Sequence, residues 1–536
     1  MTQRNHIKSK ALRFGWWVLA VIFFGLVITI RIRLLGIPLE RDEGEYAYAG
    51  QLMLQGIPPY KLAYNMKFPG TYAAYAVIMS IFGQTILGIH LGLLMVNAAT
   101  IALVFLLGRR LISSTAGIAA ATSYAVLSVS PSVLGLAAHA THFVMLPVLG
   151  GMLLFLNESV RHQSGRLFAS GLLFGLAVLM KQPALFFIVF AAIYLVSKEV
   201  QRRSTLKDIF PRSLSFSVGV VLPFGIACFL LWRSGVFGRF WFWAIEYAAQ
   251  YGSLVPLNQA PRIFLGSIEE VIGAGWGAWV LAGVGVVVGL LDSRMRPSAL
   301  FLLGFLLFST LALCSGFYFR YHYFILILPA VSLLAGAAIS KLSSFLTGRM
   351  IVVRFAPLVL LCAILVVPIL SNWKLAFVSS PIEACRTIYP ESPFPESLKI
   401  ADYVREHTSL HDTIAVLGSE PQIYFYSRRH SATGYIYTYG LMEPQRYAGR
   451  MQEEMIREIE GARPKYLISV VMPDSWLQRP GSDRLIFSWA NQYTAQNYTV
   501  AGFVNITDTE TDYYFGNAPS SVATLKDYIL IYGRNL

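Results

Sequence analysis

The chain has 536 residues, of which 55% are hydrophobic and only 13% are charged, and its mean hydropathy is +0.56. Soluble globular domains carry about 25% charged residues, so the composition excludes an ordinary soluble protein and indicates repeated crossings of a bilayer. The net charge of +14 does not indicate nucleic-acid binding, because the basic residues lie in short breaks between apolar runs, as cytoplasmic loops of membrane proteins do.

Apolar runs of about 20 residues predict eleven membrane spans. The first follows a basic N-terminus and is too long for the apolar core of a signal peptide, so we expect an uncleaved helix. The fifth and sixth are short and meet at a tight turn, Lys181–Gln182–Pro183. The spans are expected at 14–31, 85–108, 114–131, 138–157, 166–181, 184–197, 213–232, 272–291, 298–315, 322–340 and 351–371.

The basic residues also predict the orientation of the spans. With eleven spans, every cluster falls on one side: the N-terminus, Arg109 and Arg110, Arg161 and Arg166, the 198–212 segment, Arg294 and Arg296, and the 341–354 segment. Such one-sided clustering is typical of the cytoplasmic face. We therefore predict a multi-pass protein of the inner (plasma) membrane with a cytoplasmic N-terminus and an extracytoplasmic C-terminal tail.

The tail differs in composition from the membrane body, since 18 of the 29 acidic residues follow Trp373. We predict a transmembrane domain at 1–373 and an extracytoplasmic α/β domain at 374–536. The tail pattern predicts helices at 395–407, 445–461 and 482–494 and strands at 413–418, 465–471, 498–505 and 527–532. Four cysteines without a CxxC pair argue against a disulfide framework or a cysteine-based zinc site.

The first external loop, 33–85, carries the main candidates for catalysis. Asp42 and Glu43 follow the first span directly, and four of the eleven acidic residues of the membrane body lie here. A carboxylate at the membrane interface can act as a general base or a metal ligand. The alternative is structural, with Asp42 as the N-cap of a helix. We expect the loop to contain short helices that lie along the membrane surface.

Lys67 follows about 25 residues later, beside the Pro69–Gly70 turn. A lysine held in this way suits a phosphate or a carboxylate, whereas the alternative is an interfacial lysine that reaches toward lipid headgroups.

These motifs together resemble those of GT-C membrane glycosyltransferases. The resemblance rests on Asp42–Tyr48 and Lys67–Gly70, on Met180–Pro183, and on Phe319–Tyr323 at the start of a span, and it covers about residues 10–340. The nearest branch contains the protein O-mannosyltransferases and the aminoarabinose transferase of lipid A. The expected fold is therefore a GT-C-like helical membrane protein with about eleven transmembrane helices and the C-terminal extracytoplasmic α/β domain.

The resemblance implies a sugar donor linked to polyprenyl phosphate and used outside the cytoplasm. Asp42 corresponds to the presumed base that deprotonates an acceptor hydroxyl, in an inverting displacement with lipid phosphate leaving; Glu43 has a secondary part. The acceptor would be lipid A, a polysaccharide, a glycolipid or a protein of the cell envelope. The positive residues Lys67, Lys181, Arg320 and His322 are expected to bind the donor phosphate. For Arg320 the alternative is an interfacial arginine that anchors its helix.

The sequence departs from many relatives at Ala138–His142, where they carry a further acidic residue. His139 and His142 lie one helical turn apart and could contact acceptor or donor, as could Tyr46 and Tyr64. A divalent metal held by Glu43 and His142 is an open alternative, as is a pair of hydrogen-bonded interhelical histidines. No cofactor is certain from the sequence.

Two other functions fit a polytopic protein. A transporter would carry charged residues near mid-membrane and often inverted repeats, neither of which the sequence favours. A protein that binds lipid-linked glycans without transferring them would not need the acidic loop.

Overall fold

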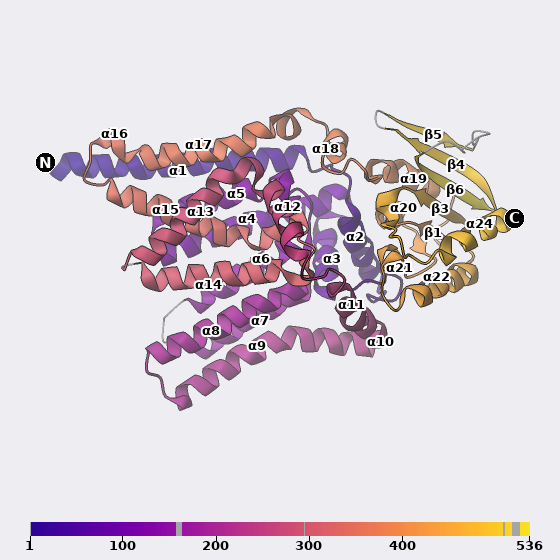
Figure 1. Cartoon of the computed structure of the whole chain (residues 1–536), viewed down its shortest axis with the longest axis horizontal. Coiled ribbons are helices and arrows are strands. Elements are labelled where there is room, and N and C mark those ends of the chain that lie inside the picture. Colours follow the sequence, from indigo (N-terminus) through magenta and orange to yellow (C-terminus); the bar gives the residue numbers. More distant parts are fainter. Residues whose placement is uncertain (1, 157–162, 294, 508–509, 517–525, 536) are drawn as a thin grey trace. The chain divides into compact units, whose positions relative to one another are not determined.

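The structure is a computed structural model, and it describes residues 2–156, 163–293, 295–507, 510–516 and 526–535, with side chains from residue 11 onward (Figure 1). The basic residues Arg161 and Arg294, used above for orientation, lie outside these ranges. The chain forms two compact units, each built from separated segments. The first comprises Met1–Leu35, His90–Ala227 and Val255–Ser379, and the second comprises Gly36–Ile89, Cys228–Leu254 and Ser380–Leu536.

The first unit is a bundle of apolar helices. All eleven predicted spans are helical, which confirms a polytopic helical membrane protein. Among the residues that the structure describes, eight helical segments have the length and composition to cross a bilayer, while α5, α6 and α17 are shorter. The helices are α1 (Thr2–Arg33), α4 (Ile86–Leu111), α5 (Ser114–Leu127), α6 (Ala140–Phe155), α7 (Gln163–Met180), α8 (Leu185–Gln201), most of α9 (Leu206–Arg233), α12 (Ala260–Ile272), α13 (Trp276–Leu291), α14 (Arg296–Leu313), α15 (Leu328–Phe345), α16 (Ile351–Arg354) and α17 (Ala356–Ser371).

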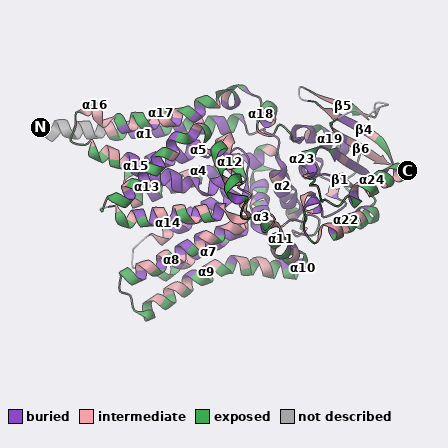
Figure 2. Ribbon diagram, viewed as in Figure 1, coloured by how far each residue is buried: buried purple, intermediate pink, exposed green. Residues whose placement is uncertain are grey.

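Helix α15 lies at the centre of this bundle and α9 at its edge. In the most apolar stretch of each, 67% of the residues are buried in α15 but only 22% in α9. Figure 2 shows α9 mostly in the green and pink of exposed and intermediate residues. Helix α15 packs against both α5 and α13. Small residues such as Gly336 and Ala116 let the backbones of α15 and α5 approach closely, which is the usual way in which helices associate in lipid.

The second unit contains a six-stranded mixed sheet, coloured yellow to orange in Figure 1. Its order is β2-β1-β3-β6-β4-β5, with β1 parallel to β2 and β3 and the other pairs antiparallel. The strands are β1 (Thr413–Leu417), β2 (His430–Ser431), β3 (Tyr466–Val471), β4 (Tyr498–Ile506), β5 (Thr511–Phe515) and β6 (Asp527–Arg534). The helices are α2 (Arg41–Leu54), α3 (Pro69–Phe82), α10 (Phe237–Trp241), α11 (Ala248–Gly252), α18 (Pro381–Ile388), α19 (Phe394–Glu406), α20 (Gln422–Ser427), α21 (Tyr439–Met442), α22 (Ala448–Ala462), α23 (Pro473–Trp476) and α24 (Leu485–Asn497).

The sequence predicted this tail correctly for its longer elements. All seven predicted helices and strands are present within about three residues of their expected ends, which confirms a C-terminal α/β fold. The prediction did not include β2, β5, α18 or α20, which have eight residues or fewer. In such short elements the apolar period is too brief to be read from the sequence.

The first loop contributes to the same core as the tail. A buried cluster contains Tyr64 of the first loop, Trp243 and Tyr247 of the segment Cys228–Leu254, and tail residues that include Tyr435 and Met455. The two short helices predicted in the loop are α2 and α3. The division of the chain into two domains at residue 373 stays a prediction. In the structure, the first loop and the tail pack together in one compact unit.

Candidate active site

Helix α2 begins at a capping box that fixes the acidic motif. Glu40 is the N-cap, and its Oε1 accepts from the Glu43 N–H at 2.9 Å, while the Glu43 carboxylate accepts from the Glu40 N–H at 3.2 Å. The structural alternative that placed Asp42 at the N-cap is therefore wrong; Asp42 lies in the first turn. Burial, with Asp42 and Glu43 nearby, raises the pKa of Glu40 well above 4.5.

Helix α2 lies directly against α20 of the tail. A Cβ atom on Gly44 would lie 2.6 Å from the backbone nitrogen of Gln422, so only glycine permits this approach. The close contact holds the first turn of α2 next to the loop that follows β1. Asp42 thus projects from a rigid helix end that the tail supports.

Lys67 bridges two carboxylates on one face of α2. Its Nζ lies 2.8 Å from Asp42 Oδ1 and 2.6 Å from Glu45 Oε2. Asp42 and Glu45 are three residues apart, which places them on the same side of the helix. The side chains of Asp42 and Lys67 are 16% and 20% exposed, whereas that of Glu45 is 1% exposed. Asp42 is therefore the more accessible carboxylate of the pair.

Glu45 is a buried anchor for the lysine. Its Oε1 accepts a hydrogen bond from the Tyr72 hydroxyl at 2.6 Å, and its Oε2 accepts one from Asn65 Nδ2 at 2.8 Å. Burial raises the pKa of Glu45, and Lys67 opposes this rise. Burial alone would lower the pKa of Lys67, but Asp42 and Glu45 outweigh it and the net pKa lies well above 10.5. The ammonium is therefore held charged.

Aromatic rings complete the surroundings of the ammonium. Lys67 Nζ lies 4.5 Å from the ring centre of Tyr46 and 5.5 Å from that of Tyr437, distances typical of cation–π contacts. The Tyr437 hydroxyl lies 3.4 Å from Asp42 Oδ1, at the long end of hydrogen bonding. Tyr46 is 1% exposed, so it forms part of the wall behind the lysine.

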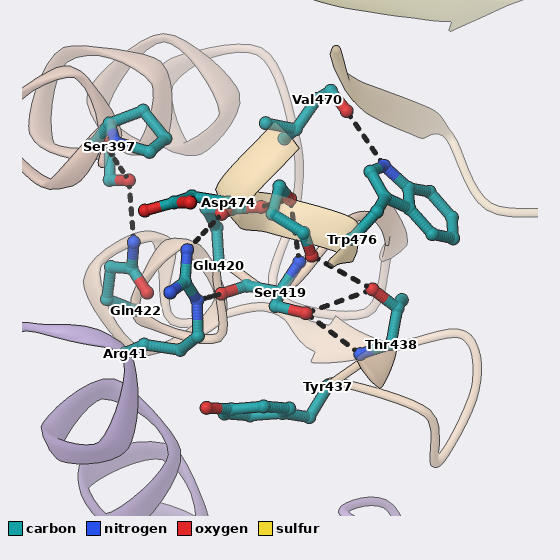
Figure 3. A network of polar contacts seen from close by, with 12 residues as sticks. Arg41, Ser397, Ser419, Glu420, Gln422, Tyr437, Thr438, Val470, Asp474 and Trp476 are labelled. Carbon is teal, nitrogen blue, oxygen red and sulfur yellow. Dashed lines mark hydrogen bonds and ion pairs between the residues drawn. The ribbon is translucent and has the colours of Figure 1, made fainter. Parts of the chain in front are cut away.

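Arg41 points toward Ser419 and Glu420 of the tail (Figure 3). Its Nε donates to the Ser419 carbonyl at 2.6 Å, and its Nη2 lies 3.3 Å from Glu420 Oε1. Glu420 is fully buried and also accepts from the Ser475 hydroxyl at 2.7 Å. Lys67 is the cation that pairs with Asp42, whereas Arg41 joins α2 to the tail.

The partners of Arg41 lie at one edge of the sheet. Ser419 and Glu420 follow β1, and Ser475 follows β3, so both loops leave the carboxyl ends of parallel strands. Thr438 joins them, since its hydroxyl lies 2.9 Å from that of Ser419 (Figure 3). This edge is where open α/β sheets usually carry functional loops. Here it carries the loops that clamp the start of α2.

Tyr64 belongs to a second polar cluster of the same unit. Its hydroxyl donates to Glu458 Oε1 at 2.8 Å, and the Arg239 guanidinium lies 4.4 Å from its ring centre. Arg239 also pairs with Glu454 at 3.0 Å. This cluster holds the loop that precedes Lys67 against α22. The residues of α22 in the cluster, Glu454 and Glu458, were not predicted as site residues.

The remaining predicted residues lie in the first unit. His139 precedes α6, and its ring stacks on that of His322 with centres 4.1 Å apart. Lys181, in the turn between α7 and α8, lies 3.8 Å from the ring centre of Tyr323, and Arg320 lies 5.9 Å from that of Tyr318. His142 is buried in the first turn of α6.

The structure thus groups the candidates into two sets, each within its own unit. Asp42, Glu43, Lys67, Tyr46 and Tyr64 lie in the second unit, and Lys181, Arg320, His322, His139 and His142 lie in the first. Glu45 was missed as a site residue, although its spacing of three from Asp42 could have indicated it. Tyr437 and Glu420 carried no such signal, since they are distant in sequence from the motif that they contact.

Apolar helices, an acidic loop after the first span and an α/β tail together define a class of membrane protein. The chain has the fold of GT-C membrane glycosyltransferases, and the predicted resemblance to that superfamily is confirmed. Residues 67–244 match the family model of dolichyl-phosphate-mannose-protein mannosyltransferases. This range includes Lys67, His139 and Lys181. No curated protein matches the sequence significantly.

Particular solved structures share this fold over nearly the whole chain. ArnT from Cupriavidus metallidurans, bound to undecaprenyl phosphate, is 16% identical over 97% of this chain and 98% of its own, with a TM-score of 0.58. The Archaeoglobus fulgidus oligosaccharyltransferase in complex with Zn and sulfate is 14% identical over 93% of this chain and 73% of its own, with a TM-score of 0.53. The same organism's AglB, with an inhibitory peptide and a dolichol-phosphate, is 13% identical over 96% of this chain and 76% of its own, with a TM-score of 0.51.

Proposed function

We propose that the protein transfers a sugar from a polyprenyl-phosphate-linked donor to an acceptor outside the cytoplasm. The observation that carries the proposal is the Lys67 ammonium held between Asp42 and Glu45 at the start of α2. The GT-C fold and the family match support it, as do relatives solved with undecaprenyl phosphate and dolichol-phosphate. The acceptor is a hydroxyl-bearing component of the cell envelope: lipid A, a polysaccharide, another glycolipid or a protein.

Asp42 acts as the general base in this proposal. Its carboxylate takes the proton of the acceptor hydroxyl while the acceptor oxygen bonds to the anomeric carbon. The bond from that carbon to the donor phosphate breaks, and polyprenyl phosphate leaves with the electron pair. One base suffices, because the leaving phosphate is already an anion and needs no proton. Attack opposite the leaving group inverts the anomeric centre.

Lys67 has two roles in the proposed mechanism. In the structure described here its charge favours the ionised form of Asp42. When a lipid phosphate arrives, the ammonium gains a further anionic partner while Glu45 still holds it. Its attraction to Asp42 then weakens, and the base becomes stronger at the moment of transfer. Glu43 has only a positioning part, because its carboxylate is engaged in the helix cap.

The donor phosphate is also proposed to involve Lys181, Arg320 and His322 of the first unit. These groups supply positive charge or N–H donors near the predicted outer ends of the spans, where a lipid phosphate lies. Arg320 has the geometry for two parallel hydrogen bonds to phosphate. Tyr46, Tyr64, His139 and His142 are proposed to shape the surroundings of donor or acceptor.

A divalent metal is a secondary part of the proposal. The stacked rings of His139 and His322 offer nitrogen ligands of the kind that zinc prefers, so this pair fits a metal. The first proposed ligand set, Glu43 with His142, draws on both units, and Glu43 is already engaged in the cap. A metal held by the histidines would polarise phosphate oxygens. Metal content of the purified protein, measured with and without His139→Ala, tests it.

The proposed topology has the N-terminus in the cytoplasm and the tail outside the inner membrane, so that Asp42 meets external acceptors. The tail is proposed to shape acceptor access and to support α2. The decisive experiment compares wild type and Asp42→Asn for sugar transfer in proteoliposomes. Mass spectrometry of envelope lipids and glycans in a deletion strain identifies the acceptor; an unchanged envelope together with inactive purified protein would contradict the proposal.

A further inference from the structure

The first unit contains a crevice with an almost wholly apolar lining. It lies between α1, α4 and α5 and has a volume of about 310 Å³. Trp17 and Phe24 of α1 and Ile101 and Phe105 of α4 line it. Trp17 is 50% exposed, so the crevice opens on the outer surface of the helices. In a unit that spans a membrane, this surface faces lipid hydrocarbon.

One end of the crevice holds a buried charge. Arg31, in the last turn of α1, lines the crevice and is only 4% exposed. Its Nη2 donates to the Ser128 carbonyl at 3.0 Å. Its Nε is buried and has no hydrogen-bond partner among the described residues. Asn97, also in the lining, donates to the Ser128 hydroxyl at 3.1 Å.

Arg31 has no counter-charge among the described residues, since no carboxylate within those ranges forms an ion pair with its guanidinium. A buried cation without an anion is costly, and such residues normally find an anion or lie in a polar cavity. None of the residues that line the crevice is acidic, so the missing anion has to come from a molecule that enters it.

The shape of the crevice suits a lipid chain. Its lining follows α1 from Arg31 to Trp17, fourteen residues, or about 21 Å at 1.5 Å per residue. A hydrocarbon leaflet is about 15 Å thick, half of a core of about 30 Å. A headgroup at Arg31 would therefore lie near the membrane surface while its chain runs inward along α1. A volume of about 310 Å³ is at the lower end of the range for ligand pockets and suits one fatty acyl chain better than the far longer chain of a polyprenyl lipid.

We propose that this crevice binds an anionic phospholipid of the leaflet at the C-terminal end of α1. The lipid phosphate pairs with the Arg31 guanidinium, and one acyl chain fills the space between α1 and α4. Phosphate is a good partner for arginine because the planar guanidinium can donate two parallel hydrogen bonds. The site does not depend on the proposed sugar transfer, since none of its residues belongs to the candidate active site.

The test is lipid binding to the purified full chain. Native mass spectrometry with palmitoyl-oleoyl phosphatidylglycerol should reveal one tightly held lipid, and phosphatidylcholine, whose net charge is zero, should bind more weakly. Arg31→Met should weaken binding of phosphatidylglycerol about ten- to a hundredfold by removing a charge-assisted contact. Ala98→Phe should also displace the lipid, because Ala98 lines the crevice, and it leaves the charge in place.

Arg33→Met is the matched control. Arg33 lies in the same helical turn but is exposed, and its guanidinium donates to the carbonyls of Ala376 and Ser379, both at 3.2 Å. Its loss should leave the bound lipid unchanged. Equal lipid affinity in wild type, Arg31→Met and Ala98→Phe would overturn the site. Equal binding of both phospholipids would refute the phosphate contact, and displacement of phosphatidylglycerol by equimolar undecaprenyl phosphate would reassign the crevice to the polyprenyl lipid.

Discussion

Replacing Asp42 by Asn separates catalysis from folding unusually well in this protein. The amide keeps the shape of the side chain but cannot accept the acceptor proton. A positioned general base contributes about 10²–10⁴-fold to rate, so turnover should fall by that factor. Folding should suffer little, because Lys67 keeps its bond of 2.6 Å to Glu45 and is not left unpaired.

The stability cost can be bounded from the same contacts. Asp42→Asn removes one charge-assisted hydrogen bond, of 2.8 Å, whose members are 16% and 20% exposed. Such bonds contribute about 1.5–3 kcal/mol, and the amide oxygen can still accept from the ammonium. We therefore expect a loss of about 1–2 kcal/mol, within the range of an ordinary substitution.

The assay follows sugar transfer from a synthetic polyprenyl-phosphate donor in proteoliposomes, with donor binding measured separately. Glu43→Gln is the matched control: it lies next in the chain, and an amide oxygen can still accept from the Glu40 N–H. We expect Glu43→Gln to retain most activity and Asp42→Asn to bind donor without turning it over. Wild-type turnover by Asp42→Asn would refute the base assignment; loss in Glu43→Gln alone would move the base by one residue.

Three further predictions follow from the site and the topology. Lys67→Ala and Arg320→Ala should each weaken donor binding about ten- to a hundredfold, measured by donor titration; unchanged affinity in both would place the phosphate elsewhere. Reporters fused after residue 205 should lie in the cytoplasm and those after residue 420 outside, and an internal signal at 420 would reverse the topology. Residues 380–536 expressed alone should melt cooperatively without transferase activity; an unfolded product would contradict an independent tail.

The isolated tail should also respond to pH in a defined direction. Burial raises the pKa of Glu420 above 4.5, and in the fragment Arg41 is absent and cannot oppose the rise. The folded fragment then binds more protons than the unfolded one, so its stability should fall as the pH rises above about 4.5. Glu420→Gln should remove this part of the pH dependence, which thermal melts at several pH values can measure. A fragment whose melting does not change with this substitution would show that Glu420 is solvated when Arg41 is missing.

The sequence predicted those features that depend on local composition. Long apolar runs decide where a helix can cross lipid, so all eleven expected spans are helical. The third is shorter than expected, because α5 ends at Leu127 and the chain then turns through Pro131. Residues 128–131, Ser-Val-Ser-Pro, carry no charge, so hydropathy alone does not mark the point before Pro131 at which the helix ends.

The site was predictable only in part. The motifs in the sequence indicated Asp42 and Lys67 separately. That the two side chains form an ion pair could be seen only in the structure. Arg41 directly precedes Asp42, but neighbouring residues of a helix point about 100° apart, so Arg41 does not share a face of α2 with Asp42. Its true partner, Glu420, lies 379 positions away, and nothing in a single sequence relates the two.

The separation of Arg41 and Glu420 in the sequence has a consequence for the synthesis of the protein. A ribosome adds about 5–20 residues per second, so roughly 20–75 seconds pass between synthesis of Arg41 and synthesis of Glu420. During this interval the acidic loop has neither its clamp at the sheet edge nor the surface of α20 against Gly44. The candidate base therefore cannot be held in place until the C-terminal residues have been made and have folded. A nascent or truncated chain would insert its helices yet remain inactive, so the last segment to be made decides when activity begins.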